Sequence, residues 1–240
     1  MKVALFFLYK RRGVLILEGI LKVWEFRDFL LQGTFVTIKM TIGAIIIGIV
    51  LGVLVGLARI SKNVILKSIS GIYLTIIRGT PMLLQIIFIF VGIPQIYNTI
   101  TGNSVSFNPI IAGTIGIGIN SGAYVAEIVR AGIQSIDIGQ MEAARSLGLS
   151  HSRAMKYIIL PQAFRIIIPP LGNEAIVLLK DTSLVSAIGA RELMNCSKMM
   201  GAKFYMYAEF LVGAAIIYLI LTFIISKLVG HLERRMAAND

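Results

Sequence analysis

The sequence contains one cysteine and two histidines, and 12 acidic side chains stand against 23 basic ones. Cys196 has no partner cysteine, which excludes an intrachain disulfide. No paired-cysteine or His-Glu-x-x-His spacing occurs, and His151 and His231 lie far apart in polar segments, so we predict no metal site and no catalytic residue. The pattern Gly-x-x-x-x-Gly-Lys-Ser/Thr is also missing, so this chain carries no P-loop for nucleotide hydrolysis.

Charged residues are scarce, at 15% of the chain, whereas hydrophobic residues reach 57%. Several apolar runs approach the roughly 20 residues that a helix needs to cross a bilayer. The composition therefore indicates a polytopic membrane protein and not a soluble domain. The net charge of +11 does not indicate a nucleic-acid partner, because the basic residues lie between apolar runs, where membrane topology and anionic lipid account for them.

The apolar runs predict an all-α fold with five transmembrane helices, at about residues 29–57, 69–91, 109–131, 164–179 and 210–229. Residues 29–240 form one transmembrane domain, and residues 1–28 form an N-terminal interfacial segment because the helical pattern around Trp24 is amphipathic. The basic loop after the first span is expected in the cytoplasm, which places the N-terminus outside and the C-terminus inside. The six Lys and Arg residues among the first 28 oppose this orientation.

The second span contains Arg78 and Pro81, and predicts a kinked helix whose arginine faces protein or water. Residues 92–108 lack Lys and Arg and predict an external loop.

The fourth span is short and carries prolines and a glycine, a pattern found at transporter binding sites. Residues 181–200 are expected to be broken and partly re-entrant. Glycines four residues apart in the first span predict a groove for close helix packing: Gly48, Gly52 and Gly56.

The most polar stretch between apolar segments is residues 137–161. Asp137 is suited to capping a short helix, Gly148 to ending it in a left-handed turn, and Ser150 to capping a second helix that stops or bends at Pro161. Many cytoplasmic loops form such helical hairpins, so this pattern alone leaves their function open.

The order of residues in this stretch, Glu142-Ala143-Ala144 and then Gly148, resembles the coupling loop of ABC importer permeases, which docks into a cleft on the ATPase subunit. From about residue 32 onward the chain resembles the polar amino acid permease family. Four further motifs in the family's order carry this resemblance: Arg78-Gly79-Thr80-Pro81, Ala123-Tyr124-Val125-Ala126-Glu127-Ile128-Val129-Arg130, Leu160-Pro161-Gln162-Ala163 and Lys180-Asp181-Thr182-Ser183-Leu184.

The resemblance implies a multi-pass subunit in the cytoplasmic membrane that works with two ATPase subunits, a second copy of itself or a close paralogue, and an extracytoplasmic amino acid binding protein. ATP and Mg²⁺ would bind in the ATPase, so this chain needs no cofactor and is not the catalyst. The residues expected to contact the ATPase are Glu142, Ala143, Ala144, Gly148, Leu149 and Ser150.

The predicted substrate is a polar amino acid, which offers an ammonium and a carboxylate and needs both acceptors and donors. Glu174 and Asp181 are the candidate acceptors, and Asn120, Tyr124 and Thr182 are the candidate donors. Glu at position 174 resembles carriers of basic amino acids, whereas Gln there is typical of glutamine carriers. We therefore expect arginine, lysine or histidine, with glutamine as the alternative; a Glu174 bonded only to its own helix neighbours is the structural alternative.

Two other classes of function fit part of the sequence. An ion-gradient-driven secondary transporter would use intramembrane acids such as Glu127, Glu174 and Asp181, but such transporters are often built from an internal repeat and none is visible here. A membrane scaffold without transport activity would leave the polar residues of the fourth span unexplained.

Overall fold

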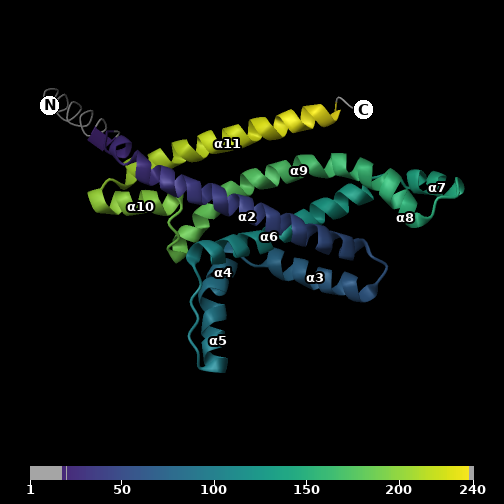
Figure 1. Cartoon of the computed structure of the whole chain (residues 1–240), viewed down its shortest axis with the longest axis horizontal. Coiled ribbons are helices and arrows are strands. Elements are labelled where there is room, and N and C mark those ends of the chain that lie inside the picture. Colours follow the sequence, from purple (N-terminus) through teal and green to yellow (C-terminus); the bar gives the residue numbers. More distant parts are fainter. Residues whose placement is uncertain (1–17, 20, 238–240) are drawn as a thin grey trace, which may run out of the picture.

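The computed structural model describes residues 18–19 and 21–237, and these residues form helices and turns without a β-strand, as predicted. Figure 1 shows an elongated molecule in which α2, α6, α9 and α11 follow the long axis and α4 and α5 project to one side. The elements are α2 (Arg27–Ile60), α3 (Val64–Gly79), α4 (Met82–Ile87), η1 (Phe88–Gly92), α5 (Ile93–Thr101), α6 (Pro109–Gln134), α7 (Ile138–Ser146), α8 (His151–Ala154), η2 (Met155–Ile159), α9 (Leu160–Asp181), η3 (Thr182–Ile188), α10 (Leu193–Phe204) and α11 (Tyr207–Ala237).

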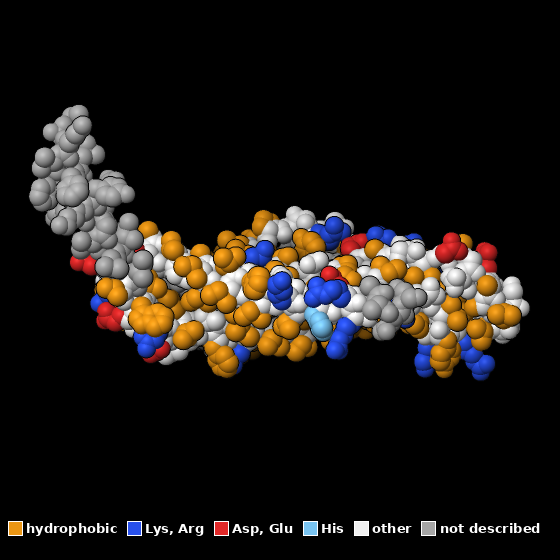
Figure 2. Space-filling model, turned by 90° about the horizontal axis from the view of Figure 1, so that it is seen from above, with side chains coloured by type: hydrophobic (Ala, Val, Ile, Leu, Met, Phe, Trp, Pro, Cys, Tyr) orange, Lys and Arg blue, Asp and Glu red, His pale blue; other side chains and the backbone are white. Residues whose placement is uncertain are grey.

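Four helical stretches of the described chain are long and apolar enough to cross a membrane: Arg27–Ile60, Met82–Thr101, Pro109–Gln134 and Tyr207–Arg235. The fourth predicted span, residues 164–179, corresponds to α9, which has 22 residues but carries several charged side chains and is not one of these stretches. Apolar side chains spread over much of the face shown in Figure 2. Such a surface is expected where lipid surrounds the protein.

The glycines of the first span lie against α6, as the predicted packing groove requires. A Cβ atom on Gly48 would lie 2.7 Å from Ser121 Oγ, and a Cβ on Gly52 would overlap the side chain of Val125. A Cβ on Gly56 would lie 2.9 Å from a backbone oxygen of α6. Because these positions lack side chains, α2 and α6 approach closely along several turns.

The prediction of one kinked helix over residues 69–91 is wrong. α3 ends at Gly79, Thr80 is extended with φ −123° and ψ 147°, and a new helix starts after Pro81. Proline has no N–H to donate and its ring disfavours helical geometry in the residue before it. The chain therefore breaks into two helices at this point.

The predicted external loop at residues 92–108 is shorter than expected, because Ile93–Thr101 continues the helical path through η1. Gly102 ends this helix in the left-handed region, with φ +71°. Asn108 then caps α6 by accepting hydrogen bonds from the backbone N–H groups of Ile110 and Ile111. Only residues 102–108 connect the two helices.

Of the two outcomes predicted at Pro161, a stop or a bend, the stop does not occur. α8, η2 and α9 follow one another without a break from His151 to Asp181. η2 is a π-helical turn, in which the N–H of Leu160 bonds to the carbonyl of Met155. A π turn changes the hydrogen-bond register by one residue, and here it comes just before the proline that cannot donate. The fourth predicted span is therefore part of one continuous helical segment.

The chain between α9 and α11 is broken, as predicted for residues 181–200; its re-entrance into the membrane stays a prediction. Gly189 takes a left-handed conformation with φ +83° after η3, and α10 follows. Glu192 is fully buried and caps α10 through the N–H groups of Met194 and Asn195, at 2.8 and 2.7 Å. Tyr218 of α11 donates a further hydrogen bond of 3.0 Å to Glu192, which fastens α10 to α11.

The described part of the N-terminal segment is helical at residues 18–19 and 21–25, and a turn at Phe26 separates it from α2. Trp24 is 67% exposed and Leu21 is 59% exposed, as expected for side chains of an interfacial helix. Most of the predicted 1–28 segment, residues 1–17, lies outside the described residues.

Candidate functional site

The polar residues of α6 bind the elements on both of its flanks. Asn120 Nδ2 donates a hydrogen bond of 3.0 Å to Gln85 on α4, and Ser121 Oγ donates one of 2.8 Å to Glu174 on α9. At about 100° per residue, Tyr124 lies between these two directions, about 40° from Asn120 and about 60° from Ser121. Tyr124 is 44% exposed, so an accessible aromatic residue lies between the directions of Asn120 and Ser121.

Gln85 fastens the break between α3 and α4. Its Nε2 donates to the carbonyl of Ile77 at 2.8 Å and to the hydroxyl and carbonyl of Thr80 at 2.8 and 3.1 Å. Its Oε1 accepts from Asn120, so one amide connects the broken segment to α6. Sequence reasoning gave Gln85 no role; the available signal was a single amide one turn after Pro81 in an apolar helix.

Glu127 is shared by two arginines. Its Oε2 accepts from Nε and Nη2 of Arg130 at 2.9 and 2.7 Å, a pair that the spacing of three residues on one helix favours. Its Oε1 lies 3.7 Å from Nη1 of Arg78 at the end of α3. The guanidinium carbon of Arg78 also lies 5.8 Å from the centre of the Tyr124 ring. Arg78 and Glu127, which belong to two separate predicted spans, therefore meet beside Tyr124.

Glu174 and Asp181 are seven residues apart on α9 and therefore share one face, about 10 Å apart along the helix. Both are partly buried. In the part of the chain that the structure describes, neither carboxylate has a Lys or Arg nitrogen within 4.0 Å. Glu174 instead accepts a hydrogen bond from the neutral hydroxyl of Ser121.

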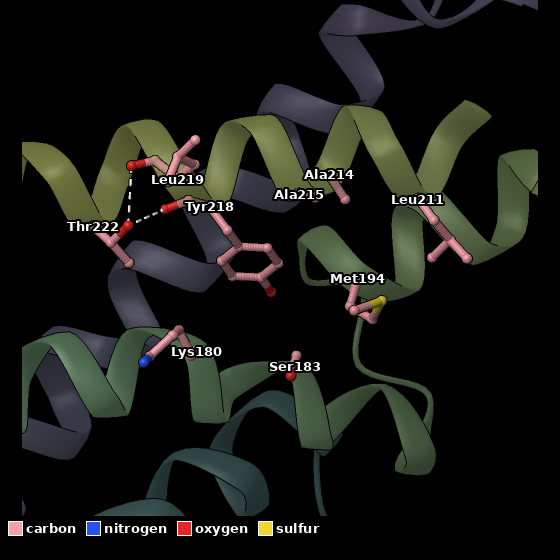
Figure 3. Close-up of a pocket in the computed structure, with 9 residues that line it drawn as sticks. All are labelled: Lys180, Ser183, Met194, Leu211, Ala214, Ala215, Tyr218, Leu219 and Thr222. Carbon is pink, nitrogen blue, oxygen red and sulfur yellow. Dashed lines mark hydrogen bonds between the residues drawn. The ribbon is translucent and has the colours of Figure 1, made fainter. Parts of the chain in front are cut away.

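Lys180 lies on a different side of α9, about 120° around the helix from Glu174. It lines a cavity of about 460 Å³ between α9, η3, α10 and α11, shown in Figure 3. Most of the lining is apolar, and the polar Tyr218 is bonded to Glu192. This cavity offers few free polar groups, so it has little of the chemistry that a polar substrate requires.

The five predicted substrate residues differ in accessibility. Tyr124 is exposed, and Glu174 and Asp181 are partly exposed. Asn120 is 4% exposed and bonded to Gln85, whereas Thr182 is fully buried and donates to the carbonyl of Leu179 at 2.7 Å. In this conformation, Asn120 and Thr182 use their side chains within the fold.

The predicted hairpin at residues 137–161 is present at one end of the molecule, as α7 and α8 in Figure 1. Asp137 caps α7 by accepting from the N–H of Gly139 at 2.7 Å, and Ser150 caps α8 by accepting from that of Arg153 at 3.4 Å. Gly148 has φ +84°, the left-handed conformation expected between the two helices.

The side chains of this hairpin form an exposed edge. Glu142 and Ala143 are exposed, whereas Ala144 is buried against the protein. Leu147 is 85% exposed at the turn, although leucine is normally buried in a folded chain. Leu149 is only partly exposed. This arrangement suits contact with another protein, whereas no described group of His, Cys, Asp or Glu residues is arranged to hold a metal ion.

An all-helical chain with membrane-spanning segments, ionisable side chains between its helices and a helical hairpin exposed at one end has the features of the membrane-spanning part of a transporter. Residues 48–238 match the family of binding-protein-dependent transport system inner membrane components, and the chain belongs to that family.

Relatives of similar length support this assignment. The chain is 38% identical to a putative glutamine transport system permease protein of Rickettsia typhi, over 93% of this chain and 100% of the relative. It is 37% identical to the arginine transport system permease protein of Bacillus subtilis, over 88% and 94% of the two chains. A crystal structure of an amino acid ABC transporter with histidines matches with a TM-score of 0.84 and 39% identity, over 90% of this chain and 98% of that one.

These matches identify the chain as the permease subunit of an ABC importer for amino acids, of the polar amino acid family. Its family is the non-catalytic membrane component, and ATP hydrolysis belongs to a separate subunit. The alternatives of an ion-gradient-driven transporter and of a scaffold are therefore set aside.

Proposed function

We propose that this permease carries basic amino acids, namely arginine, lysine or histidine, into the cytoplasm. The observation that supports this most is the environment of Glu174. Its carboxylate accepts a hydrogen bond from Ser121 at 2.8 Å but has no basic side chain within 4.0 Å among the described residues. A charge without a counter-ion at membrane depth is unfavourable, and a cationic substrate would supply that counter-ion.

Other residues around α6 and α9 extend this site. Asp181 lies on the same face of α9 as Glu174, so a cation that leaves one carboxylate meets the other about two turns away. Tyr124 is 44% exposed and lies between the directions of Asn120 and Ser121 on α6, so its hydroxyl is a candidate donor. Asn120 and Thr182 would contribute only after their present hydrogen bonds to Gln85 and Leu179 open.

The permease would function in a larger assembly. Each of two ATPase subunits, which bind ATP and Mg²⁺, needs a docking hairpin, and this chain has one, so a second copy or a close paralogue supplies the other. Docking would use the hairpin residues Glu142, Ala143, Ala144, Gly148, Leu149 and Ser150. An extracytoplasmic binding protein would deliver the substrate. The N-terminus would lie outside and the C-terminus in the cytoplasm, with α9 as the fifth crossing.

Glutamine is the second candidate substrate, because permeases named for glutamine transport in Rickettsia typhi and Escherichia coli are 38% and 36% identical to this chain. A glutamine amide would donate to Glu174 without neutralising it.

The decisive experiment reconstitutes the permease with its ATPase and binding protein in proteoliposomes that contain ATP and Mg²⁺. We expect uptake of radiolabelled arginine, lysine or histidine that requires ATP hydrolysis and resists dissipation of ion gradients. Uptake of glutamine alone would overturn the basic-substrate proposal in favour of the second candidate. Uptake that persists without ATP would contradict the importer mechanism.

A further inference from the structure

Arg78 lies beside the proposed substrate site. Its guanidinium has only one long ion pair, to Glu127, among the described residues. Arg78 is in the last turn of α3, two residues before the extended Thr80. Its side chain is 48% exposed, although it is placed between helices of a membrane domain. An ionisable residue inside a membrane domain commonly marks a substrate or ion path.

Within the described residues, Glu127 is the only carboxylate within 4.0 Å of Arg78. The separation of 3.7 Å is longer than a charge-assisted hydrogen bond, and the other oxygen of Glu127 is occupied by Arg130 at 2.9 and 2.7 Å. A guanidinium has five N–H donors in one plane, arranged to bind a carboxylate through two parallel hydrogen bonds. Arg78 therefore has N–H donors left with which to bind a second carboxylate.

The position of Arg78 relative to Glu174 fits a zwitterionic ligand. Arg78 lies beside Tyr124, 5.8 Å from the ring centre, and Glu174 is bonded to Ser121, less than one turn away on α6. Tyr124 lies between the two on the surface of the helix. An amino acid whose cationic group meets Glu174 would present its carboxylate towards the Arg78 side. Lys180 is not placed for this role because it lines the separate cavity in Figure 3.

We propose that Arg78 binds the α-carboxylate of the transported amino acid, with the Tyr124 hydroxyl beside it. This inference rests on the proposed function, because it assumes that Glu174 contacts the cationic part of the same substrate. Arg78 thereby selects for a free carboxylate, whereas Glu174 selects for charge at the other end. The shared carboxylate of Glu127 holds the guanidinium in place until the substrate binds.

The test measures equilibrium binding of radiolabelled arginine to the purified permease–ATPase complex without the binding protein, and competition by argininamide, which lacks the carboxylate charge. We expect the wild-type complex to bind arginine about 10- to 100-fold more tightly than argininamide, the range for a hydrogen-bonded charge pair. Arg78→Gln is expected to weaken arginine binding by a similar factor and to leave argininamide binding unchanged. Arg78→Lys retains the charge and is expected to keep part of the preference.

Arg59→Gln is the matched control, because Arg59 is in the last turn of α2 and its Nη1 donates to the carbonyl of Lys67. It removes the same charge and is expected to leave the preference unchanged. If Arg78→Gln and Arg78→Lys both keep the wild-type preference, or weaken both ligands equally, Arg78 has only a structural role. A wild-type complex without preference also overturns this inference. A wild-type complex that binds glutamine and no arginine contradicts the basic-substrate proposal instead, and the same comparison is then made with glutamine and its α-amide.

Discussion

Ser121 on α6 donates a hydrogen bond of 2.8 Å to Oε1 of Glu174 on α9. The bond joins residues 53 positions apart in the sequence and orients the carboxylate without neutralising its charge. A neutral donor thus positions Glu174, whereas Glu127, which is on α6, is held by Arg130 and Arg78. Glu174 can still pair with a cation, whereas Glu127 is already paired with two arginines. Substitution of Glu174 tests this difference.

Glu174→Gln is expected to raise the KM for arginine by about tenfold or more, because a hydrogen bond to a charged group contributes about 1.5–3 kcal/mol. Glutamine uptake and basal ATPase activity are expected to persist. The measurement is uptake into proteoliposomes that contain the complete importer. Asp28→Asn, which removes an exposed carboxylate at the start of α2, serves as the charge control. Unchanged arginine transport by Glu174→Gln would show that Glu174 does not read the charge of the substrate.

Gly148→Val is expected to uncouple ATP hydrolysis from transport while the protein still inserts in the membrane. Gly148 has φ +84°, and a residue with a Cβ pays about 1–2 kcal/mol in that region, with β-branched valine among the least tolerant. Gly148→Asn is the matched variant, because asparagine tolerates left-handed geometry, and it is expected to retain coupling. Substrate-stimulated ATPase activity measures the effect. Full coupling in the valine variant would show that the hairpin turn is not part of the docking surface.

The proposed orientation predicts that two positions are labelled from opposite sides of the membrane. In a Cys196→Ala background, Ser104→Cys is expected to react with an impermeant maleimide only from outside, and His151→Cys only from the cytoplasm. Ser104 and His151 are both exposed, and Cys196 is buried, so its replacement removes an inaccessible thiol. Labelling of position 104 from the cytoplasmic side would reverse the topology.

Gly52→Ala is expected to destabilise the permease by about 1–3 kcal/mol, the usual range for overpacking. The added Cβ would overlap Val125 and would also lie 3.0 Å from the backbone nitrogen of Ala126, so a side-chain rotation alone does not relieve the contact. Gly230→Ala is the control, since the nearest atom to its Cβ would be 3.9 Å away. Thermal unfolding in detergent measures both variants. Equal Tm values would show that α2 and α6 are not tightly packed at Gly52.

The sequence predicted the features that depend on local chemistry. Spacing of Gly48, Gly52 and Gly56 indicated a packing face, and Asp137, Gly148 and Ser150 indicated a helical hairpin, because caps and left-handed turns require particular residue types. These features appear as predicted. The spacing of Glu127 and Arg130 likewise fixed their pair, since residues three apart meet on one helix.

Other features depend on contacts that the sequence does not show. α3 ends before Pro81, and the amide of Gln85 donates to the carbonyls of the broken end, whereas Pro161 lies within a continuous helix just after a π turn. Both prolines have the same local effect on hydrogen bonding, so only their neighbours separate the outcomes. The burial of Asn120 and Thr182 also depends on distant segments, and composition gave no sign of it.

The unbroken helical segment from α8 to α9 connects the hairpin directly to Glu174, so a rigid tilt of the segment would move both. His151 and Glu174 are 23 residues apart, which corresponds to about 35 Å of helix. A tilt of about 10° at the docking end would displace the other end by about 6 Å, more than enough to break a hydrogen bond of 2.8 Å to Ser121. If the ATPase docks at the hairpin as proposed, its motion would reach the carboxylate along a continuous helix and release it from Ser121.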